Sequence, residues 1–420
     1  MRLTLVIHPI TEIRSGATTR LDGTRLEINK AELERHLLED TRLASADFEI
    51  VRPGENCRVG GVIDILEPRA KDPGSIGSDF PGILSPFTLA GQGTTHVLRG
   101  AAVTLVGEGG GTGATRILPM SGPPADASAY GRLQHLVVLP RGRPGVDRHQ
   151  VAMAAHEALL KTGIYLAQVA FMQPPATMEV FDLDDAESPD RKDLPRVVYI
   201  GQVFSHQSAY ELDEKIIYAH NTVGLVPVPL HPNEWLDGGV MPSSSGNMDS
   251  YFYQNHPVIL GLYRRHKARK LNFAGTIVTA SAVGDDERYR NCMVAANLAK
   301  WCLRADIAVL TKTGGGAPHA DMGLTAHNCE LAGIKTSVQV NDSSVDGRAE
   351  SALLFNYEDV NAIVDVGGRG VIWKVPAAER VIALNPAVAA RLAPAQDLAA
   401  QNVCGVTNQQ GASRLRTTIY

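Results

Sequence analysis

A regular alternation of strand-like and helix-like segments in the second half of the chain constrains the fold most. Short apolar runs typical of buried strands are separated by longer segments with helical spacing. This order predicts a parallel sheet whose strands are joined by helical crossovers. The strands are expected at 196–200, 273–279, 306–310, 335–340 and 362–366, and the helices at 287–303 and 320–332.

The first part of the chain has a different pattern. It is rich in Gly and Pro and contains short alternating runs at 4–7, 61–65 and 102–106, which predict a β-rich region with many turns. Helical spacing begins near residue 145, where Asp147 is a plausible N-cap for a long amphipathic helix. The expected fold is therefore α/β, with a β-rich N-terminal domain followed by α/β domains with a mainly parallel sheet. The expected division is 1–143, 144–265 with the helix and the first part of the α/β domain, and 266–420.

Composition excludes several classes of protein. A chain of 420 residues with 44% hydrophobic and 20% charged content has enough apolar residues for two or three globular domains. A formal net charge of -5 gives no basic field, so nucleic acid is not an expected partner. No apolar run reaches the roughly 20 residues of a membrane span, and the N-terminus has the pattern of a strand instead of a signal peptide. We expect a cytoplasmic protein without a membrane partner.

The five cysteines are scattered, and no two form a Cys-x-x-Cys pair. This spacing argues against a disulfide framework, a zinc ribbon and an intrachain redox couple. We expect most of these thiols to be buried. They are Cys57, Cys292, Cys302, Cys329 and Cys404.

Several separated segments, in the same order, carry a family resemblance over residues 1–420. They are Met1-Arg2-Leu3, Arg52-Pro53-Gly54-Glu55, Asp64-Ile65-Leu66-Glu67-Pro68-Arg69, Phe80-Pro81-Gly82, Thr95-His96-Val97-Leu98-Arg99-Gly100, Met120-Ser121-Gly122-Pro123, Asp237-Gly238, Leu271-Asn272-Phe273 and Tyr420. With these segments the chain resembles the proprotein of component B of glycine, sarcosine and betaine reductases, and is also similar to the D-proline reductase proprotein. The resemblance implies a hetero-oligomer with a second component B-like subunit that carries a reactive Cys or Sec, and a small-molecule amine substrate.

The resemblance also implies a self-derived pyruvoyl cofactor, which the family makes by cutting its own chain at a cysteine. In that reaction a side-chain oxygen or sulfur attacks the preceding carbonyl, the ester or thioester eliminates to dehydroalanine, and hydrolysis leaves a keto-acyl N-terminus. The matching stretch here contains serines and no cysteine. An ungapped match places the reacting residue at Ser245, with Ser244 supplying the attacked carbonyl. Another gap placement puts Met248 there, which cannot react, and the composition also fits a plain surface loop.

A site acting on such a substrate needs cations for a carboxylate and a group that transfers protons. The matching segments offer Arg52, Arg69 and His96 as catalytic candidates beside Ser244 and Ser245, and Arg99 as a substrate-binding candidate. Glu55 and Glu67 follow the same logic. A structural hydrogen bond is the alternative for His96.

A second constellation follows the predicted strand 306–310. Gly314, Gly315 and Gly316, with His319, lie where a strand ends and a helix begins, which is where open α/β sheets bind ligands and helix N-termini favour anions. We expect these four residues to bind substrate. The alternatives are a plain turn with Asp321 as the helix cap, and a metal site of His319, Asp321 and His327; we predict no metal.

The resemblance implies an enzyme subunit that acts on the C–N bond of a small amine or amino-acid-like substrate, and the leading hypothesis for its mechanism is a serine-derived pyruvoyl group. Two other hypotheses stay open. In one, the uncut chain and a thiol-bearing partner hydrolyse a C–N bond without a pyruvoyl. In the other, the chain is a non-catalytic scaffold that completes the pocket of that partner.

Overall fold

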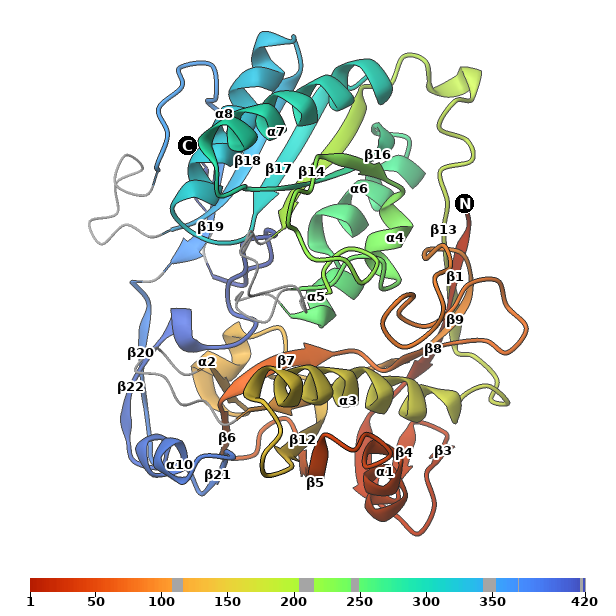
Figure 1. Cartoon of the computed structure of the whole chain (residues 1–420), viewed down its shortest axis with the longest axis vertical. Coiled ribbons are helices and arrows are strands. Elements are labelled where there is room, and N and C mark those ends of the chain that lie inside the picture. The colour runs from red at the N-terminus through yellow and green to blue at the C-terminus, as the bar shows by residue number, and fades with distance from the viewer. Residues whose placement is uncertain are drawn as a thin grey trace.

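The chain forms two stacked parts, each built around its own sheets (Figure 1). The computed structural model describes residues 1–107, 116–203, 215–242, 249–342, 353–368, 370–415 and 418–419. One part holds the N-terminal strands together with β20 (Ile372–Val375), β21 (Arg380–Ile382), β22 (Gln396–Ala399) and α10 (Pro386–Leu392) from the C-terminal region, and the other holds the large sheet of the second half of the chain.

The large sheet has seven strands in the described chain. Its central five strands are parallel, and an antiparallel strand closes each edge. In spatial order the strands are β15 (Val228–Leu230), β16 (Asn272–Ala280), β14 (Arg196–Val203), β17 (Ile307–Lys312), β18 (Lys335–Asp342), β19 (Ile363–Gly368) and β23 (Thr418–Ile419). The expected α/β class and the mainly parallel sheet are confirmed.

The order of the parallel strands creates a switch point. The chain leaves β14 for β16 on one side, then crosses back to β17 on the other side, which is the 2-1-3-4-5 order of doubly wound sheets. In such sheets, ligands bind where the connections diverge, at the carboxyl ends of the strands. Here that place lies at the ends of β14 and β17.

Helices cover both faces of the large sheet (Figure 1). Because side chains alternate along a strand, Val198 and Ile200 face one core while Val197 and Tyr199 face the other. The first core is closed by α7 (Asp285–Asn297) and α8 (Ala317–Leu331). The second is closed by α4 (Pro232–Leu236), α5 (Ser250–Gln254) and α6 (Pro257–Lys267), and it also takes in Leu3, Leu5 and Ile7 of the N-terminal part. This shared core joins the two parts.

The N-terminal part contains two four-stranded sheets and smaller ones. The first has the order β13 (Thr177–Phe181), β1 (Leu3–Pro9), β9 (Gly93–Arg99) and β8 (Arg69–Lys71). The second has the order β5 (Leu43–Val51), β12 (Gln134–Gly142), β10 (Ala101–Val106) and β7 (Val62–Leu66). The smaller sheets are formed by β2 (Glu12–Ser15), β4 (Arg25–Ile28) and β3 (Arg20–Asp22); by β11 (Ile117–Pro119), β6 (Cys57–Gly60) and β21 (Arg380–Ile382); and by β20 (Ile372–Val375) and β22 (Gln396–Ala399).

The remaining helices cover the sheets of the N-terminal part. The long helix α3 (Arg148–Gln168) begins at Asp147, whose carboxylate accepts a hydrogen bond from the His149 N–H, so the predicted N-cap is confirmed. This helix packs across β7, β8 and β10. The other helices of the N-terminal part are α1 (Lys30–Leu37), α2 (Gly122–Ala127) and α10 (Pro386–Leu392). Elsewhere in the chain, short 3₁₀ turns lie at Pro189–Arg191 and Ala400–Asn402.

Two details of the predicted elements differ from the structure. The helix expected at 287–303 is α7 followed by a π turn at Leu298–Cys302. Asp321 is not a helix cap: α8 begins after Gly316, and Asp321 lies inside the helix, where it forms an ion pair with Arg288 of α7 at 2.6 Å. The partner of the Asp321 carboxylate is therefore the Arg288 guanidinium, and not the free backbone N–H groups at the start of the helix.

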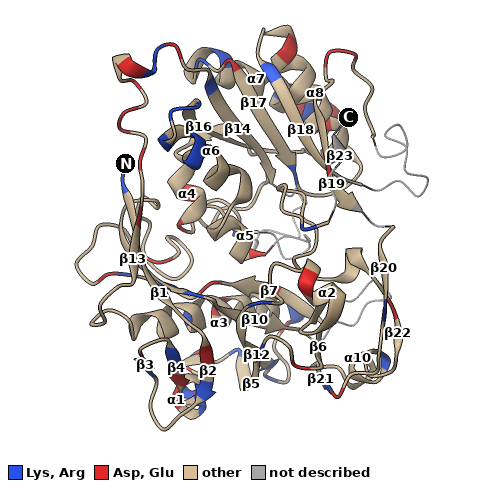
Figure 2. Ribbon diagram, turned by 180° about the vertical axis from the view of Figure 1, so that it is seen from behind, with Lys and Arg blue, Asp and Glu red and all other residues tan. Residues whose placement is uncertain are grey.

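Charged side chains of both signs are interspersed over both parts of the described chain (Figure 2). The basic run at 264–270 falls at the end of α6. Among the described residues, no helix combines the length and the apolar character needed to cross a bilayer.

Candidate active site

The serine segment itself, residues 243–248, lies outside the described residues, and with it Ser244, Ser245 and Met248. The chain on both sides of it is described, and both flanks are buried at Met241, Pro242, Asp249 and Ser250. The two flanks themselves are attached to the rest of the fold by buried polar contacts.

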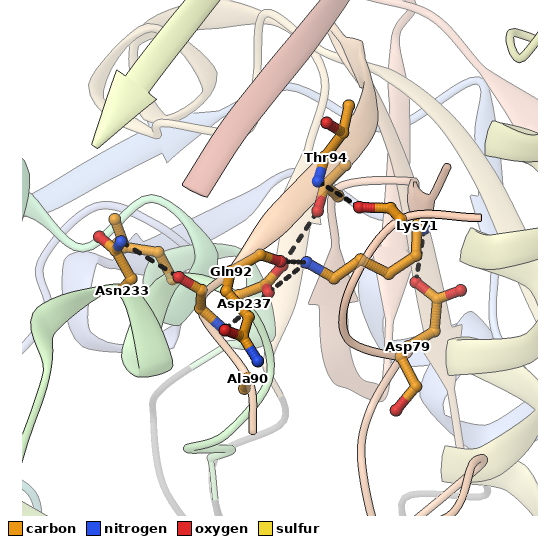
Figure 3. Close-up of polar contacts among 12 residues, drawn as sticks. Lys71, Asp79, Ala90, Gln92, Thr94, Asn233 and Asp237 are labelled. Carbon is orange, nitrogen blue, oxygen red and sulfur yellow. Dashed lines mark hydrogen bonds and ion pairs between the residues drawn. The ribbon is translucent and has the colours of Figure 1, made fainter. Parts of the chain in front are cut away.

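The flank before the segment is attached through Asp237 (Figure 3). Its carboxylate forms an ion pair with the Lys71 ammonium of β8 at 2.5 Å, and both side chains are buried. The same carboxylate accepts hydrogen bonds from the Gly91 N–H and from the Thr95 hydroxyl. Because a buried charge without partners is costly, these contacts fix the turn after α4 to the β8–β9 edge.

A second carboxylate lies beside this ion pair. Asp79 accepts a hydrogen bond from the Lys71 backbone N–H at 2.9 Å (Figure 3). Burial, reinforced by the negative charge of Asp237, raises the pKa of Asp79 to about 6. This part of the site therefore changes its charge just below neutral pH.

The flank after the segment is attached through Ser250, the first residue of α5. Asp64 of β7 accepts a hydrogen bond from the Ser250 N–H at 2.8 Å and another from the Ser250 hydroxyl at 2.6 Å. His156 of α3 reaches the same carboxylate at 3.2 Å. A residue of the N-terminal sheet thus holds the start of α5.

The neighbouring residue Asp249 makes its own buried contacts. Its carboxylate pairs with Arg116 at 2.6 Å and accepts a hydrogen bond from the Tyr130 hydroxyl at 2.8 Å. Burial raises the pKa of Asp249, and the charge of Asp64 acts in the same direction while Arg116 opposes both. Both residues that follow the serine segment are therefore held by the N-terminal part.

Glu67 lies between two of the predicted arginines. It is fully buried, and it pairs with Arg69 at 2.6 Å and with Arg99 at 2.8 Å. Burial opposes ionisation of Glu67, but the two guanidinium groups outweigh it and hold the pKa of the carboxyl below its usual value. The structure thus brings Arg69 and Arg99 together on one carboxylate.

The two arginines differ in how fully their donors are used. Arg69 is buried and also donates to the carbonyls of Leu236 and Gln254 and to the Asn255 side chain. Arg99 leaves 35% of its side chain exposed and has a further ion pair with Glu179 at 3.6 Å. Arg69 therefore joins β8 to α4 and α5, while Arg99 retains access to solvent.

His96 lies on the other face of the same sheet. Along β9, side chains alternate, so His96 points away from the face that carries Thr95 and Arg99. Its ring contacts His8 at 3.0 Å and Asp72 at 3.0 Å, and it packs edge-on against Phe171. A shared hydrogen-bond network with Arg69 and Arg99 is not formed among the described residues, and a catalytic role for His96 stays a prediction.

Arg52 lies in a third place. It pairs with Glu55 at 3.3 Å and donates to the Ile13 carbonyl of β2. Nearly half of its side chain, 47%, is exposed. In the described part of the chain it forms no hydrogen bond or ion pair with Glu67, Arg69 or Arg99, so its catalytic role also stays a prediction.

The glycine-rich turn lies at the carboxyl end of β17, at the switch point of the large sheet. Thr313, at its start, lies beside the Tyr253 hydroxyl of α5, which follows the serine segment by a few residues. Beneath the turn, the Tyr199 hydroxyl contacts Thr311 at 2.7 Å and His256 at 3.0 Å. The turn and the described flank after the serine segment are therefore in contact.

The alternative metal ligands are not gathered at one point. Asp321 pairs with Arg288, His327 contacts Asp359 at 2.8 Å, and His319 packs against the ring of Phe355. Within the described ranges, no group of three or more His, Cys, Asp or Glu side chains is arranged to hold a metal ion.

Four of the five cysteines are buried, and Cys302 is exposed, which confirms the prediction for most of the thiols. Burial raises the pKa of Cys57 and Cys292 to about 11 and that of Cys329 and Cys404 to about 12. These four thiols are protonated at neutral pH and are poor nucleophiles.

Sequence reasoning did not single out Lys71, Asp79 or Asp249 as site residues. Asp64 and Asp237 stood inside the matching segments, which was the available signal, but nothing local assigned them a partner. Their contacts join residues 186 and 166 positions apart.

Comparison with known proteins confirms the family resemblance that the matching sequence segments indicate. Residues 1–404 match the family model described as glycine/sarcosine/betaine reductase component B subunits. The chain is 29% identical to the glycine reductase complex component B subunits alpha and beta of Peptoclostridium acidaminophilum over 386 residues, covering 91% of this chain and 89% of the relative. It is 28% identical to the sarcosine reductase complex component B subunit alpha of the same organism over 395 residues, covering 91% and 90%.

A third relative from that organism, the betaine reductase complex component B subunit alpha, is 28% identical over 386 residues, covering 90% of this chain and 86% of its own. No solved structure matches the chain significantly. Since the family model spans nearly the whole sequence, the chain belongs to the glycine/sarcosine/betaine reductase component B family.

Proposed function

We propose that this chain is a subunit of a component B-like complex that breaks the C–N bond of a small amine or amino-acid-like substrate, and that Ser245 supplies a pyruvoyl group. The observation that carries the proposal is the attachment of both flanks of the serine segment by buried polar contacts, at Lys71–Asp237 and at Asp64–Ser250. Attack of a side chain on the preceding carbonyl requires closely fixed ends, because misplacement by about 1 Å can cost about a hundredfold in rate.

The names of the relatives support the choice of substrate and of processing. Glycine, sarcosine and betaine are all carboxylates with a nitrogen on the adjacent carbon, and we place the substrate of this chain in that class. The glycine reductase relative is a single chain whose name covers two subunits, alpha and beta, which is what a chain cut after synthesis would give.

A pyruvoyl group supplies a carbonyl that withdraws electrons from the C–N bond of an amine bound to it. The described residues would hold and orient the reactants around it. Arg69 and Glu67 tie β8 to α4 and α5, Arg99 presents a partly exposed cation, and the Gly314–Gly316 turn with His319 provides further donors.

The reacting thiol or selenol would come from a partner subunit. Four of the cysteines in this chain are buried with a raised pKa, so a thiolate at neutral pH is not available from them. This favours a hetero-oligomer with a second component B-like chain.

The intact mass of freshly purified protein tests the proposal. Serine processing predicts two fragments, 1–244 and 245–420, of which the second reacts with phenylhydrazine or borohydride. Ser245→Ala should abolish the cut, while the matched variant Ser244→Ala keeps the nucleophile and should still be cut.

A single full-length species that does not react with either reagent would contradict serine processing. Two hypotheses then remain. In one, the uncut subunit hydrolyses a C–N bond with a thiol-bearing partner; in the other, the chain is a non-catalytic scaffold. Replacing Arg99 separates these two, because only the enzyme subunit should lose activity when assayed with its partner.

A further inference from the structure

The turn between β17 and α8 has the placement of a ligand site. It follows the carboxyl end of β17, next to β14, where the connections of the large sheet diverge. Gly314 and Gly316 have φ values of 98° and 65°, which few other residues adopt. The turn leads into α8, a helix of 15 residues, whose N-terminal end favours negative charge.

His319 gives a second and independent indication. Its side chain is only 4% exposed, and its buried Nε2 atom has no hydrogen-bond partner among the residues that the structure describes. Leaving a buried polar group unpaired costs about 1 to 3 kcal/mol. A site that binds a ligand at this atom accounts for that cost.

The place of His319 in α8 favours a ring that faces the turn. His319 occupies the third position of α8, and side chains in a helix lean toward the helix N-terminus. Burial and the positive charge of Lys312 lower the pKa of His319 to about 4, so the ring is neutral and can donate a hydrogen bond through Nε2. The Lys312 ammonium donates to the Gly314 carbonyl at 2.7 Å, which places a cation under the same turn.

The described part of the chain leaves space around the turn. A Cβ atom built on Gly315 or Gly316 would meet no other atom of it within 4 Å, and both residues are exposed. The Gly314 N–H already donates to Gln409, whereas the Gly315 and Gly316 N–H groups have no acceptor among the described residues. The turn therefore offers backbone donors and a neutral imidazole to one ligand.

We propose that this turn binds the carboxylate of the substrate, with His319 Nε2 and the backbone N–H groups of Gly315 and Gly316 as donors at the N-terminal end of α8. The proposal rests on the proposed function only for the class of substrate, a small amino or N-methylated amino acid. It assigns the carboxylate to the switch point of the large sheet and leaves Arg99 paired with Glu67.

Binding of acetate and of glycine to the full-length protein tests this assignment, by calorimetry and by NMR of histidine labelled in its ring. Gly315→Val is the sharpest variant. Its Cβ meets nothing in the unliganded fold and Gly315 has no positive φ, so the fold should tolerate it while the side chain fills the ligand space. Gly370→Val is the matched control, because Gly370 is equally open and exposed.

We expect saturable binding of both probes at one site per chain and a shift of the His319 ring nitrogens. Gly315→Val should weaken binding at least about tenfold because its side chain fills the ligand space. His319→Leu should weaken binding by a similar factor because it removes a hydrogen-bond donor, which is a large part of a weak carboxylate affinity. His319→Gln keeps a donor near the Nε2 position and should bind within about threefold of the unaltered chain, as should Gly370→Val.

The absence of saturable binding, or equal binding by Gly315→Val and the unaltered chain, would overturn the proposal. Inorganic phosphate that binds more tightly than glycine would overturn the carboxylate assignment. Performing the titrations on the Ser245→Ala chain separates this inference from the proposed function: an uncut chain that binds glycine supports the turn and says nothing for the pyruvoyl, and a processed chain that does not bind glycine overturns the turn alone.

Discussion

Asp64 accepts both hydrogen bonds that Ser250 donates, from its backbone N–H at 2.8 Å and from its hydroxyl at 2.6 Å. The two residues belong to different parts of the molecule, since Asp64 is on β7 and Ser250 opens α5. Asp64 therefore determines where the chain resumes after the serine segment.

Asp64→Asn should lower the free energy of unfolding by about 2 kcal/mol, because it removes the charge that accepts two hydrogen bonds in a buried place. Denaturant unfolding measures this loss. Asp126→Asn, on the exposed side of α2, is the matched control and should stay within about 0.5 kcal/mol. An unchanged midpoint for Asp64→Asn would mean that other contacts hold Ser250. If fixed flanks are needed for processing, the same variant should also slow the appearance of the two fragments.

Lys71→Met should destabilise the protein by about 3 kcal/mol, because it leaves the buried Asp237 carboxylate without its cation. In a double-mutant cycle with Asp237→Asn, the two substitutions together should cost clearly less than the sum of the single ones, since the asparagine carries no charge to compensate. Purely additive losses would show that the two side chains do not depend on each other.

The exposed pair of Arg141 and Asp47 is the control for that cycle. Its atoms are 3.9 Å apart, and more than half of each side chain is exposed. Solvent screens such a pair, so its removal should cost at most about 1 kcal/mol.

How much the sequence predicts depends on the range of the interactions. The five parallel strands of the large sheet were predictable, because each is an apolar run long enough to be recognised alone, whereas the short edge strands β15 and β23 were not predicted. Asp147 was predictable because its cap bond reaches only to His149. Because side chains alternate between the two faces of a strand, the positions of His96 and Arg99 in β9 could also have predicted that they lie on opposite faces of the sheet.

The contacts of the candidate site were not predictable in the same way. The helices α4 and α5 have five residues each, too few for a periodic pattern, and they are fixed by tertiary contacts such as those of Arg69 with Leu236 and Gln254. No rule of local spacing links Lys71 to Asp237 across 166 residues. The family segments marked some of these residues without stating what they contact.

The pH dependence of stability should carry the signature of Asp79. Burial raises its pKa to about 6, whereas an aspartate in an unfolded chain titrates near 4. The folded protein therefore holds this proton more tightly, and the contribution of the group to stability falls as the pH rises from about 4 to about 6. Asp79→Asn keeps the acceptor for the Lys71 N–H and removes the titration.

The variant and the unaltered chain should then differ little at pH 4, and the variant should be more stable by about 2 kcal/mol at pH 7. Unfolding at a series of pH values measures the difference, in which the other titrating groups cancel. A difference that is constant between pH 4 and pH 7 would show that Asp79 titrates normally.

The cysteines allow a prediction that concerns the partner. Only Cys302, on the π turn after α7, is exposed, and burial raises the pKa of the four other thiols. Under native conditions near pH 8, a thiol reagent such as dithionitrobenzoate should therefore modify one thiol per chain rapidly, and all five after denaturation. Cys302→Ser should remove the rapid phase. Because the proposed reaction takes its thiol or selenol from the partner, the same variant should keep full activity in the assembled complex. Loss of activity in Cys302→Ser, with the stability unchanged, would place the reacting thiol in this chain and remove the chemical need for a thiol-bearing partner.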